Sequence, residues 1–573
     1  MNRDRLAERI APHLRLVYPD TAGTVIDQVL DLAERWAPEV SATLTRHPAS
    51  RPDAGTSYLI TYGDAIRRPG EAPLHTLAQV LHDVVDGAVT DVHLLPIYPS
   101  TSDDGFAVVD HRAVSPDLGT WDDVGAIAAD HGLMLDFVAN HVSASSPWFT
   151  GWLAGEPGRA GYFLDPGPGF DTSRVVRPRT SPLVHDYTRP DGTTARAWST
   201  FSRDQVDVEV RTPAVLVELT DVLLGYVARG ATTVRLDAIG FLWKESGTTS
   251  IHLPQTHAVI KVWRALLDEL APDVRLLTET NVPHTENISY FGDGGDEAHM
   301  VYQFALPPLV LHAFVTGDAT VLARWASTVG PVGPDATWFN FLASHDGVGM
   351  RPSEGLLTDA DRALLVDRAL AHGGRVSMTT RPDGSESVYE LNVSYIDALS
   401  APGTTDEEIA RRALAAHSIL LAMVGVPAIY YHSLFGSTHD REGMEASGVN
   451  RRINRQVLDA DRLTAELAEV PRRHIVFEGL RDLMAVRRTQ PAFSPFASQQ
   501  VEHLDPRVLV IRRAAGTDDE VMAVTNVSSQ PVELPGVLGV DLVTGKPVAG
   551  LRLEPNDFAW VRSWAGRRDT PSD

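Results

Sequence analysis

The chain has 573 residues, which is too long for one ordinary hydrophobic core and predicts two or more domains. Its share of apolar residues, 43%, is typical of a soluble globular protein, and the absence of cysteine excludes disulfides, thiolate metal sites and a thiol nucleophile. The net charge of −25 and the lack of a long basic run argue against a nucleic-acid partner.

Residues 1–50 carry apolar residues at helical spacing, in LAERIAPHLRLVY and VIDQVLDLAERWAPEV, and predict a helical N-terminal extension. The first residues contain no uninterrupted apolar segment of the kind found in signal peptides. No apolar run in the chain reaches the roughly 18 residues that a membrane span requires. We therefore expect a cytoplasmic protein without a membrane partner.

Eight short apolar runs follow this extension and predict β-strands. Most are almost continuously apolar, which is typical of parallel strands that are buried on both faces. Helical patterns separate many of them, and eight strand-helix units predict an α/β fold, the (β/α)8 or TIM barrel, over residues 51–489. The runs are SYLITYG (57–63), DVHLLPIYP (91–99), LMLDFVANH (133–141), TTVRLDAIG (232–240), VRLLTETN (274–281), MVYQFALP (300–307), TWFNFLASHD (337–346) and VPAIYYHS (426–433).

Two stretches between these runs are too long for simple loops and predict insertions. Residues from about 142 to 205 are rich in Gly, Pro and Arg and predict a lid or small inserted domain, and a second insertion spans about 350–405. From residue 490 to 565, short strand patterns alternate with turn signals and predict a C-terminal all-β domain. Residues 566–573 are expected to form a disordered tail.

Polar residues occur late in several of the apolar runs: Asn140 and His141, then Asp237, Glu279 and Asp346. The carboxyl ends of the strands of a (β/α)8 barrel form one rim, and this rim carries the active site. Unrelated polar residues at strand ends are the alternative, but they would not recur at the same place in four runs. We therefore expect these side chains to meet in one active site.

The three acids suit the cleavage of a glycosidic bond. Arg235 lies two residues before Asp237, so a strand points both to one side, and the arginine is expected to lower the pKa of Asp237 and keep this nucleophile ionised. Glu279 follows apolar residues, a setting in which a carboxylic acid keeps its proton and acts as general acid. Two such carboxyl groups about 5 Å apart are typical of enzymes that retain the anomeric configuration of the sugar. Asp346 is expected to stabilise positive charge near the anomeric carbon.

Four motifs make this chemistry more specific: DFVANH, VRLDAIG, TETN and ASHDG, in this order along the chain. They resemble the four motif regions of the alpha-amylase superfamily, glycoside hydrolase family 13, and the resemblance extends from about residue 55 to the end. It implies that Asp237 is the nucleophile, Glu279 the general acid/base and Asp346 the transition-state stabiliser. It also implies that Arg235 orients the nucleophile, and that other residues contact the glucosyl ring (His141, His345) or support the third strand (Asp136, Asn140).

Further segments, among them LPIYPSTSDDGFAVVDHRAVSPDLGTWDDV and MVYQFALPPLVLHAF, resemble the sucrose phosphorylase branch of that superfamily. This resemblance implies that Asp103 holds glucosyl hydroxyls and that Phe106 lies near the cleaved bond. In NRRINRQ, Arg455 best matches an arginine that grips glucose, with Arg451 and Arg452 as alternatives. The branch cleaves an α-glucoside with inorganic phosphate to α-glucose 1-phosphate, by double displacement through a β-glucosyl enzyme.

Phosphate as a nucleophile requires cations near the site. Arg177 and Arg179, with Arg174 and His185, supply candidates on the first insertion, and a solvated basic loop is the alternative. The sequence contains no calcium loop of the Asp-x-Asp-x-Asp-Gly type, no histidines at zinc spacing and no glycine-rich nucleotide loop. We therefore expect no metal and no cofactor, with inorganic phosphate as the co-substrate.

The acceptor half of the site is expected beyond Asp346, where Arg351 and Pro352 follow two glycines. Arg351 suits an anionic acceptor, and the long chain with its helical start resembles the glucosylglycerate phosphorylases. The resemblance implies 2-O-α-glucosylglycerate as the glucoside, with sucrose 6'-phosphate and sucrose as alternatives. A retaining hydrolase or transglucosidase, or an inactive barrel used for binding, are the other interpretations. The sequence leaves open whether the protein is a monomer or a homodimer.

Overall fold

A closed barrel of parallel strands forms the centre of the molecule. The structure is a computed structural model and describes residues 1–380 and 384–563. Within these residues the barrel strands follow one another in the order β1-β16-β12-β11-β10-β9-β4-β3, so the predicted (β/α)8 barrel is confirmed. The strands are β1 (Tyr58–Thr61), β3 (Asp91–Leu94), β4 (Gly132–Phe137), β9 (Ala231–Leu236), β10 (Arg275–Thr278), β11 (Met300–Tyr302), β12 (Thr337–Phe341) and β16 (Val426–Tyr430).

The sixth predicted strand is shorter than its apolar run. Strand β11 ends at Tyr302, and the remainder of MVYQFALP leads into helix α9 (Leu306–Thr316), which has prolines in its first turn. Proline fits the first turn of a helix because it has no N–H group to leave unpaired there. A continuous apolar run by itself does not distinguish a strand from the start of a buried helix.

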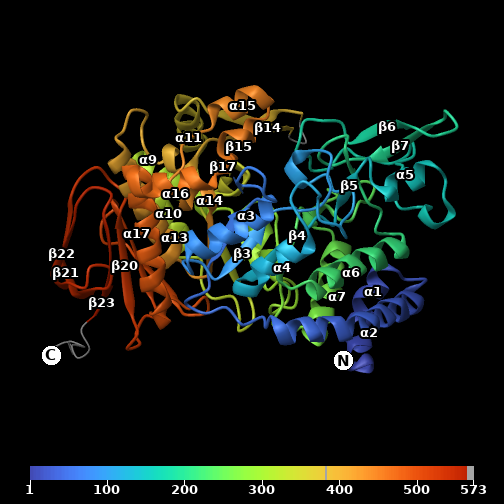
Figure 1. The fold of residues 1–573 in the computed structure, drawn as a ribbon, viewed down its shortest axis with the longest axis horizontal. Coiled ribbons are helices and arrows are strands. Elements are labelled where there is room, and N and C mark those ends of the chain that lie inside the picture. Colours follow the sequence, from blue (N-terminus) through green and yellow to red (C-terminus); the bar gives the residue numbers. More distant parts are fainter. Residues whose placement is uncertain (381–383, 564–573) are drawn as a thin grey trace.

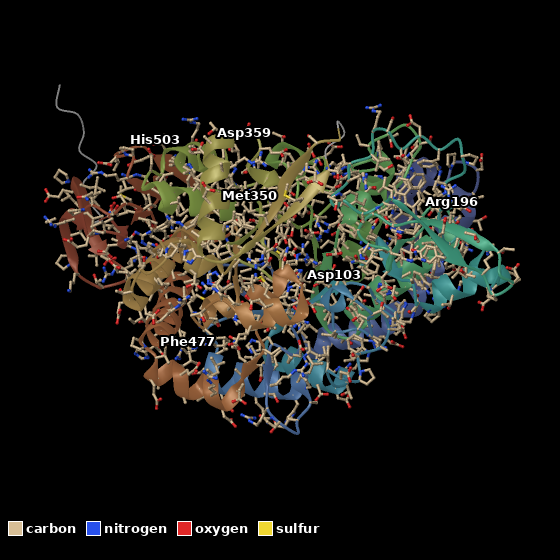
Figure 2. The ribbon with its side chains drawn as sticks, turned by 90° about the horizontal axis from the view of Figure 1, so that it is seen from above. Asp103, Arg196, Met350, Asp359, Phe477 and His503 are labelled. Atoms are coloured by element: carbon tan, nitrogen blue, oxygen red, sulfur yellow. The ribbon has the colours of Figure 1, made fainter. Side chains whose placement is uncertain are left out.

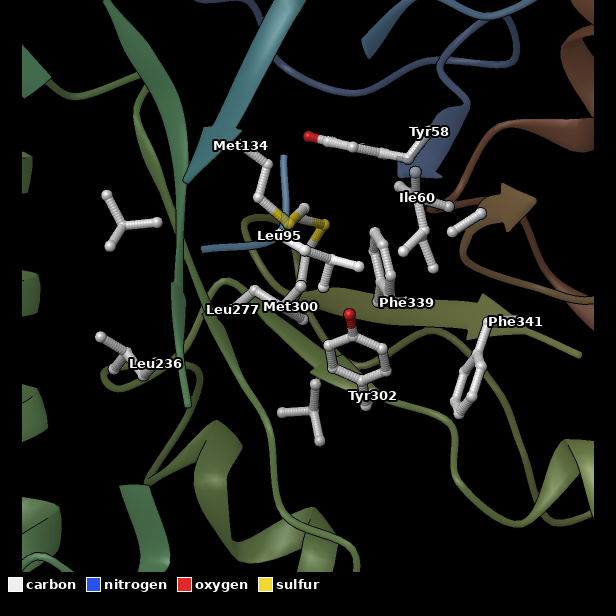
Figure 3. Packing of buried hydrophobic residues seen from close by; sticks show 14 of the residues in the cluster. Tyr58, Ile60, Leu95, Met134, Leu236, Leu277, Met300, Tyr302, Phe339 and Phe341 are labelled. Atoms are coloured by element: carbon white, nitrogen blue, oxygen red, sulfur yellow. The ribbon is translucent and has the colours of Figure 1, made fainter. Parts of the chain in front are cut away.

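Side chains fill the barrel interior. Figure 3 shows Tyr302, Phe339 and Phe341 next to one another, and the ring centroids of Tyr302 and Phe339 are 4.7 Å apart. Tyr58 also packs against Phe339, with ring centroids 5.3 Å apart, and its hydroxyl lies 2.8 Å from the Thr233 hydroxyl, so both buried groups have a partner. The barrel is therefore a packed core that gives the strand ends a rigid base.

Helices connect the strands, and several begin with signals that the sequence displays. Thr120 and Asp123 form a capping box at the start of α4, and Pro213 and Pro254 open the helices on either side of β9. The helices are α3 (Pro73–Val80), α4 (Trp121–Asp130), α6 (Pro213–Ala228), α7 (Pro254–Leu270), α8 (His284–Asn287), α9, α10 (Thr320–Ala326), α13 (Asp406–Ala422), α14 (Tyr431–Leu434), α15 (Arg441–Ser447), α16 (Ala460–Glu469) and α17 (Pro471–Arg488).

The N-terminal segment forms two helices, α1 (Arg3–Val17) and α2 (Ala22–Arg46), which pack against α7 and α6 at one end of the molecule (Figure 1). Trp36 donates its indole N–H to Asp221 on α6 over 2.9 Å. Tyr18 donates its hydroxyl to the Val210 carbonyl over 2.6 Å, just before α6 begins. The extension therefore braces the segment that leads from the first insertion back to β9.

The first insertion lies far from the C-terminal sheet in Figure 1. It contains two antiparallel pairs and a helix: β5 (His141–Ser143) with β8 (Gln205–Asp207), β6 (Val184–Thr188) with β7 (Thr194–Trp198), and α5 (Pro147–Leu153). The second insertion contains α11 (Asp359–Ala371), α12 (Tyr395–Ala398) and a sheet in the order β13 (Val348–Gly349), β15 (Glu386–Asn392), β14 (Arg375–Thr380). A β-bridge between Arg177 and Thr380 joins the two insertions.

The C-terminal domain is an antiparallel sheet that packs one face on the barrel. The predicted all-β domain is thus confirmed, and the expected tail lies outside the described residues. Alternate residues of β19 divide between two cores: Leu509 and Ile511 join the barrel core, and Val508 and Val510 a separate one. The strands, ordered β18-β19-β20-β23-β21-β22, are β18 (Gln499–Glu502), β19 (Val508–Arg513), β20 (Val521–Asn526), β21 (Val532–Asp541), β22 (Pro547–Leu553) and β23 (Phe558–Arg562).

No helix in the described part of the chain has both the length and the apolar character that crossing a membrane requires.

Arg487 joins the barrel to the C-terminal domain. Its guanidinium is buried on α17 and donates to main-chain carbonyls of Leu421 (3.0 Å), Thr56 (3.3 Å), Gly425 (3.3 Å) and Phe493 (3.0 Å). Buried carbonyls without a donor each cost about 1–3 kcal/mol. This one side chain therefore holds three parts of the chain together.

We predict that Arg487→Met lowers the thermal unfolding midpoint by several degrees, because several buried carbonyls lose their donor at once. Arg488→Met is the matched control, since Arg488 is the next residue and also donates to carbonyls, those of Gly87 and Ala88, at a more exposed position. The midpoints of both variants are measured by circular dichroism. Equal midpoints for the two variants would contradict the linking role of Arg487.

Candidate active site

Three carboxylates meet at the carboxyl end of the barrel. Asp237 directly follows β9, Glu279 directly follows β10, and Asp346 lies five residues after β12 ends at Phe341. Because these strands are parallel neighbours or near neighbours in the ring, their carboxyl ends share one rim. All three side chains line a pocket with an empty volume of about 610 Å³.

Most of the predicted site residues line this pocket, and four do not. Figure 2 shows Asp103 near the middle of the molecule, with Arg196 of the first insertion at one end and Met350 on its other side. The predicted residues that line the pocket are Asp103, Phe106, His141, Arg179, Asp237, Glu279, His345 and Asp346. Arg177, Arg235, Arg351 and Arg455 are not among its lining residues.

Arg235 lies behind Asp237 and holds it. Its Nη1 atom is 2.9 Å from Asp237 Oδ1, and the same nitrogen contacts Asp136 at the end of β4. The expected low pKa of Asp237 is wrong as a net effect. Burial raises the pKa of Asp237 well above its usual range, Arg235 opposes the rise, and the charge of Glu279 adds to it. Arg235 can be read from the sequence, but the burial of Asp237 is seen only in the structure.

The backbone holds Glu279 beside Asp237. Its Oε2 atom accepts the N–H of Ala238 over 3.0 Å, and Ala238 has a left-handed backbone with φ of 48°. This strained turn directly after Asp237 aims an N–H group at the neighbouring strand end. Burial raises the pKa of Glu279, which agrees with the expected carboxylic acid that keeps its proton.

Asp346 is held by an arginine that the sequence analysis gave only as an alternative. Arg451 Nη1 lies 2.7 Å from Asp346 Oδ1, and its Nε and Nη2 bind both oxygens of Glu390 over 2.9 and 2.8 Å. Burial alone would raise the pKa of Asp346, but Arg451 and then Arg455 bring it below its ordinary value. Glu390 comes from β15 of the second insertion and is buried. No motif pointed to it; an acid within an apolar strand pattern was the available signal.

Arg455, the predicted glucose-gripping arginine, faces a different cavity. It donates Nε to the His345 carbonyl over 2.7 Å and ion-pairs with Asp104. That cavity also has Tyr62 in its wall and lies beside the main pocket. Arg451 lies within the 3₁₀ helix Asn450–Asn454, whereas Arg455 follows it with a non-helical backbone (φ −130°), so the two side chains leave the chain in different directions, although Arg455 Nη2 still lies 3.7 Å from Asp346 Oδ1. Arg451 therefore faces the pocket, and Arg455 lies behind it.

A buried ion pair supports His141. The Lys244 ammonium lies 2.8 Å from Asp207 Oδ2 and donates to Asn140 Oδ1 over 2.8 Å. Asn140 in turn donates to Asp207 over 3.0 Å and lies 3.3 Å from the His141 ring. All four side chains are buried. The network thus ties β8 of the first insertion to the end of β4, and no sequence motif pointed to Lys244 or Asp207.

Two rings form an apolar wall of the pocket. The rings of Phe106 and His345 stack with centroids 4.9 Å apart and planes 9° from parallel. Burial lowers the pKa of His345 well below its usual range, and Arg455 lowers it further, so the imidazole is neutral. His141 Nε2 lies 3.1 Å from the Phe106 carbonyl and 3.2 Å from the Gln205 amide nitrogen. A flat apolar wall of this kind suits a sugar ring.

The candidate phosphate arginines separate into different positions. Arg179 lines the pocket, with its guanidinium 5.0 Å above the Tyr389 ring and 5.7 Å from the Phe201 ring. Arg177 donates to the Thr180 carbonyl over 3.2 Å and shapes the loop that carries Arg179. Arg174 is exposed and donates to the Gly247 carbonyl. Arg179 is therefore the member of the group that a pocket ligand would meet.

Arg351 lies outside the pocket lining. It is in a short 3₁₀ turn, and its Nη2 atom is 3.5 Å from Glu286 Oε2. Glu286 also contacts His252 over 3.2 Å, so Arg351 and His252 share this carboxylate. The acceptor role expected for Arg351 stays a prediction.

In the described part of the chain, no group of three or more His, Asp and Glu side chains is arranged to hold a metal ion. Asp293 and Asp296, the isolated acids of the FGDGGDE turn, pair with Lys261 over 3.5 and 3.0 Å.

Comparisons with known proteins show which family the chain resembles. Residues 74–346 match the alpha-amylase catalytic domain. Glucosylglycerate phosphorylase from Allomeiothermus silvanus is 44% identical over 97% of this chain and 98% of its own, and the Escherichia coli enzyme of that name is 42% identical over 89% and 92%. Sucrose phosphorylase from Agrobacterium vitis is 32% identical over 76% and 88%. The crystal structure of sucrose 6F-phosphate phosphorylase from Thermoanaerobacter thermosaccharolyticum shares the fold, with a TM-score of 0.71 at 24% identity, over 82% and 94%.

The chain therefore belongs to the alpha-amylase family, a family of enzymes, and the resemblance expected from its four motifs is confirmed. Within this family, its identity to the two glucosylglycerate phosphorylases exceeds its identity to the sucrose phosphorylase.

We predict that Arg451→Met removes the partner of two carboxylates, Asp346 and Glu390, and costs about 3–5 kcal/mol of stability near neutral pH. Both pKa values lie below their usual range in the native enzyme, so their contribution is present at neutral pH and is lost as pH falls through those values. The difference in thermal midpoint between native and variant enzyme should therefore stay nearly constant from about pH 8 to about pH 5 and shrink as the pH falls from about 5 to about 2.

Arg452→Met is the matched control for this measurement. Arg452 is adjacent, pairs with Asp104 and is 37% exposed, so its loss should change the midpoint little at any pH. A difference for Arg451→Met that stays constant across the pH range would contradict the assigned pairing.

Proposed function

We propose that the protein is a retaining phosphorylase that transfers a glucosyl group from an α-glucoside to inorganic phosphate and releases α-glucose 1-phosphate. The proposed glucoside is 2-O-α-glucosylglycerate, which would release glycerate. The observation that carries the reaction is the meeting of Asp237, Glu279 and Asp346 in one pocket that Arg179 also lines. The glucoside is supported by the glucosylglycerate phosphorylases, at 42–45% identity.

In the first step, Asp237 attacks the anomeric carbon while Glu279 gives its proton to the glycosidic oxygen. Glycerate leaves, and the glucosyl group stays bound to Asp237 as an ester. Arg235 contacts Asp237 directly, whereas Glu279 accepts a backbone N–H, so the proton that the buried pair retains belongs on Glu279. Asp346, which Arg451 keeps ionised, would stabilise positive charge on the sugar.

In the second step, a phosphate oxygen attacks the same carbon, Glu279 takes the phosphate proton, and the bond to Asp237 breaks. Two inversions leave the glucosyl group in the α configuration. Arg179 would hold the phosphate, because a planar guanidinium matches two phosphate oxygens. Arg451 is already committed to Asp346 and Glu390, whereas no carboxylate among the described residues is ion-paired with Arg179.

The reaction as proposed requires no cofactor, and a monomer or a homodimer would perform it equally. A cytoplasmic location is part of the proposal, since phosphorolysis conserves the glucosyl group as a sugar phosphate. The same three carboxylates would serve a hydrolase or transglucosidase, so the acceptor must be tested directly.

The first test is the reverse reaction. The enzyme is given α-glucose 1-phosphate with glycerate, glycerol, fructose or fructose 6-phosphate, and phosphate release is measured. We predict that glycerate gives the highest rate and that Asp237→Asn loses at least about 10³-fold in rate. Equal phosphate release with and without each acceptor would show hydrolysis instead.

The second test separates the arginines. We predict that Arg179→Ala raises the KM for phosphate by about 10- to 100-fold, the value of a lost charged hydrogen bond. Arg174→Ala is the control on the same insertion and should leave this KM unchanged.

Arg351→Ala is predicted to weaken glycerate use and to spare the hydrolysis of α-glucose 1-phosphate. An equal loss of both reactions would make Arg351 structural.

A further inference from the structure

A histidine of the barrel interior is connected to the nucleophile. His93 lies on β3, is fully buried, and has no part in the mechanism above. Its Nε2 atom is 2.7 Å from Asp136 Oδ2. Asp136 is also fully buried, at the end of β4, the strand next to β3 in the ring. A hydrogen bond of this length between two buried groups fixes both side chains.

The contact continues to Asp237 through one arginine nitrogen. Asp136 uses Oδ2 for His93 and Oδ1 for Arg235 Nη1, and this same Nη1 is 2.9 Å from Asp237 Oδ1. Asp136 and Arg235 are register partners on β4 and β9. Four side chains on three adjacent strands therefore form one line, from His93 to the nucleophile. Asp136 and Asp237 share one guanidinium nitrogen, whose two N–H groups serve one carboxylate each, so a shift of this nitrogen toward one carboxylate moves it away from the other.

The protonation of His93 follows from its surroundings. Nδ1 is buried and has no hydrogen-bond partner among the described residues, so an imidazolium would bury an unpaired N–H. Burial lowers the pKa of His93, and Asp136 opposes this shift. The ring is therefore neutral, with its proton on Nε2, and it donates to Asp136.

We propose that His93 is a positioning residue, whose Nε2–H occupies one oxygen of Asp136 so that Arg235 stays engaged with Asp237. Without this donor, Asp136 would have an unpaired buried oxygen and would draw the guanidinium away from the nucleophile. The nucleophile would then ionise less readily. The inference rests on the proposed function, because it needs Asp237 to act as the nucleophile.

The charged groups around these four side chains determine whether loss of the His93 donor raises or lowers the pKa of Asp237. Arg235 is the cation that contacts Asp237 directly, so a weaker contact raises the nucleophile's pKa. The groups that act on Asp237 are Arg235 on β9, Asp136 on β4, Glu279 after β10 and Asp346 after β12, and His141 and His345 line the same pocket. His93 itself faces Asp136 and Arg235.

The test compares His93→Gln with His93→Met. Glutamine places an amide N–H where Nε2–H lies, and methionine has similar length and no donor. The pH dependence of kcat/KM is measured with 2-O-α-glucosylglycerate and phosphate. In His93→Met we expect the acid limb of this profile to shift to higher pH by about 0.5–1 unit. The value of kcat/KM at neutral pH should fall by about tenfold, and His93→Gln should restore both readouts to near the native values.

The position of the limb does not depend on how much of a variant is folded, so a purely structural role would lower the rate without moving the limb. His93→Leu is a second donor-free variant if His93→Met does not fold. The same acid limb for the donor-free variant and His93→Gln would overturn the inference. Lack of phosphorolysis in the native enzyme would instead refute the proposed function and leave the limb comparison without a substrate.

Discussion

The site depends on one buried guanidinium, that of Arg235, which lies between two carboxylates inside the barrel. A buried cation is stable only beside groups of opposite charge, and Asp136 and Asp237 provide these from adjacent strand ends, both through Nη1. Because this arginine is 2% exposed, it has no alternative partner in solvent. The orientation of Asp237 therefore follows from the packing of β4 against β9 and needs no mobile loop.

The two insertions complete the site through further buried pairs. Lys244 and Asp207 tie the first insertion to the end of β4, while Glu390 brings the second insertion to Arg451 and thereby to Asp346. Breaking such a pair leaves an uncompensated buried charge, which is far more costly than losing a surface pair. These contacts hold the pocket walls at fixed positions around the carboxylates.

The pattern of the sequence was sufficient for the barrel and for the three carboxylates. Continuous apolar runs mark strands buried on both faces, and an acid directly after such a run has one rim on which to lie. The pattern was insufficient where a side chain's direction depends on the turn that carries it. Arg451 and Arg455 belong to one motif, but a 3₁₀ helix ends between them, and only Arg451 lines the pocket.

The sequence by itself determined the fold class, the family and the residues at the strand ends, because these follow from local periodicity and from motifs of a few residues. Only the tertiary structure decided which arginine meets Asp346, that Glu390 and Lys244 belong to the site, and that burial raises the pKa of Asp237. These features depend on contacts between residues far apart in the chain and on the exclusion of water, and neither can be predicted from short stretches of sequence.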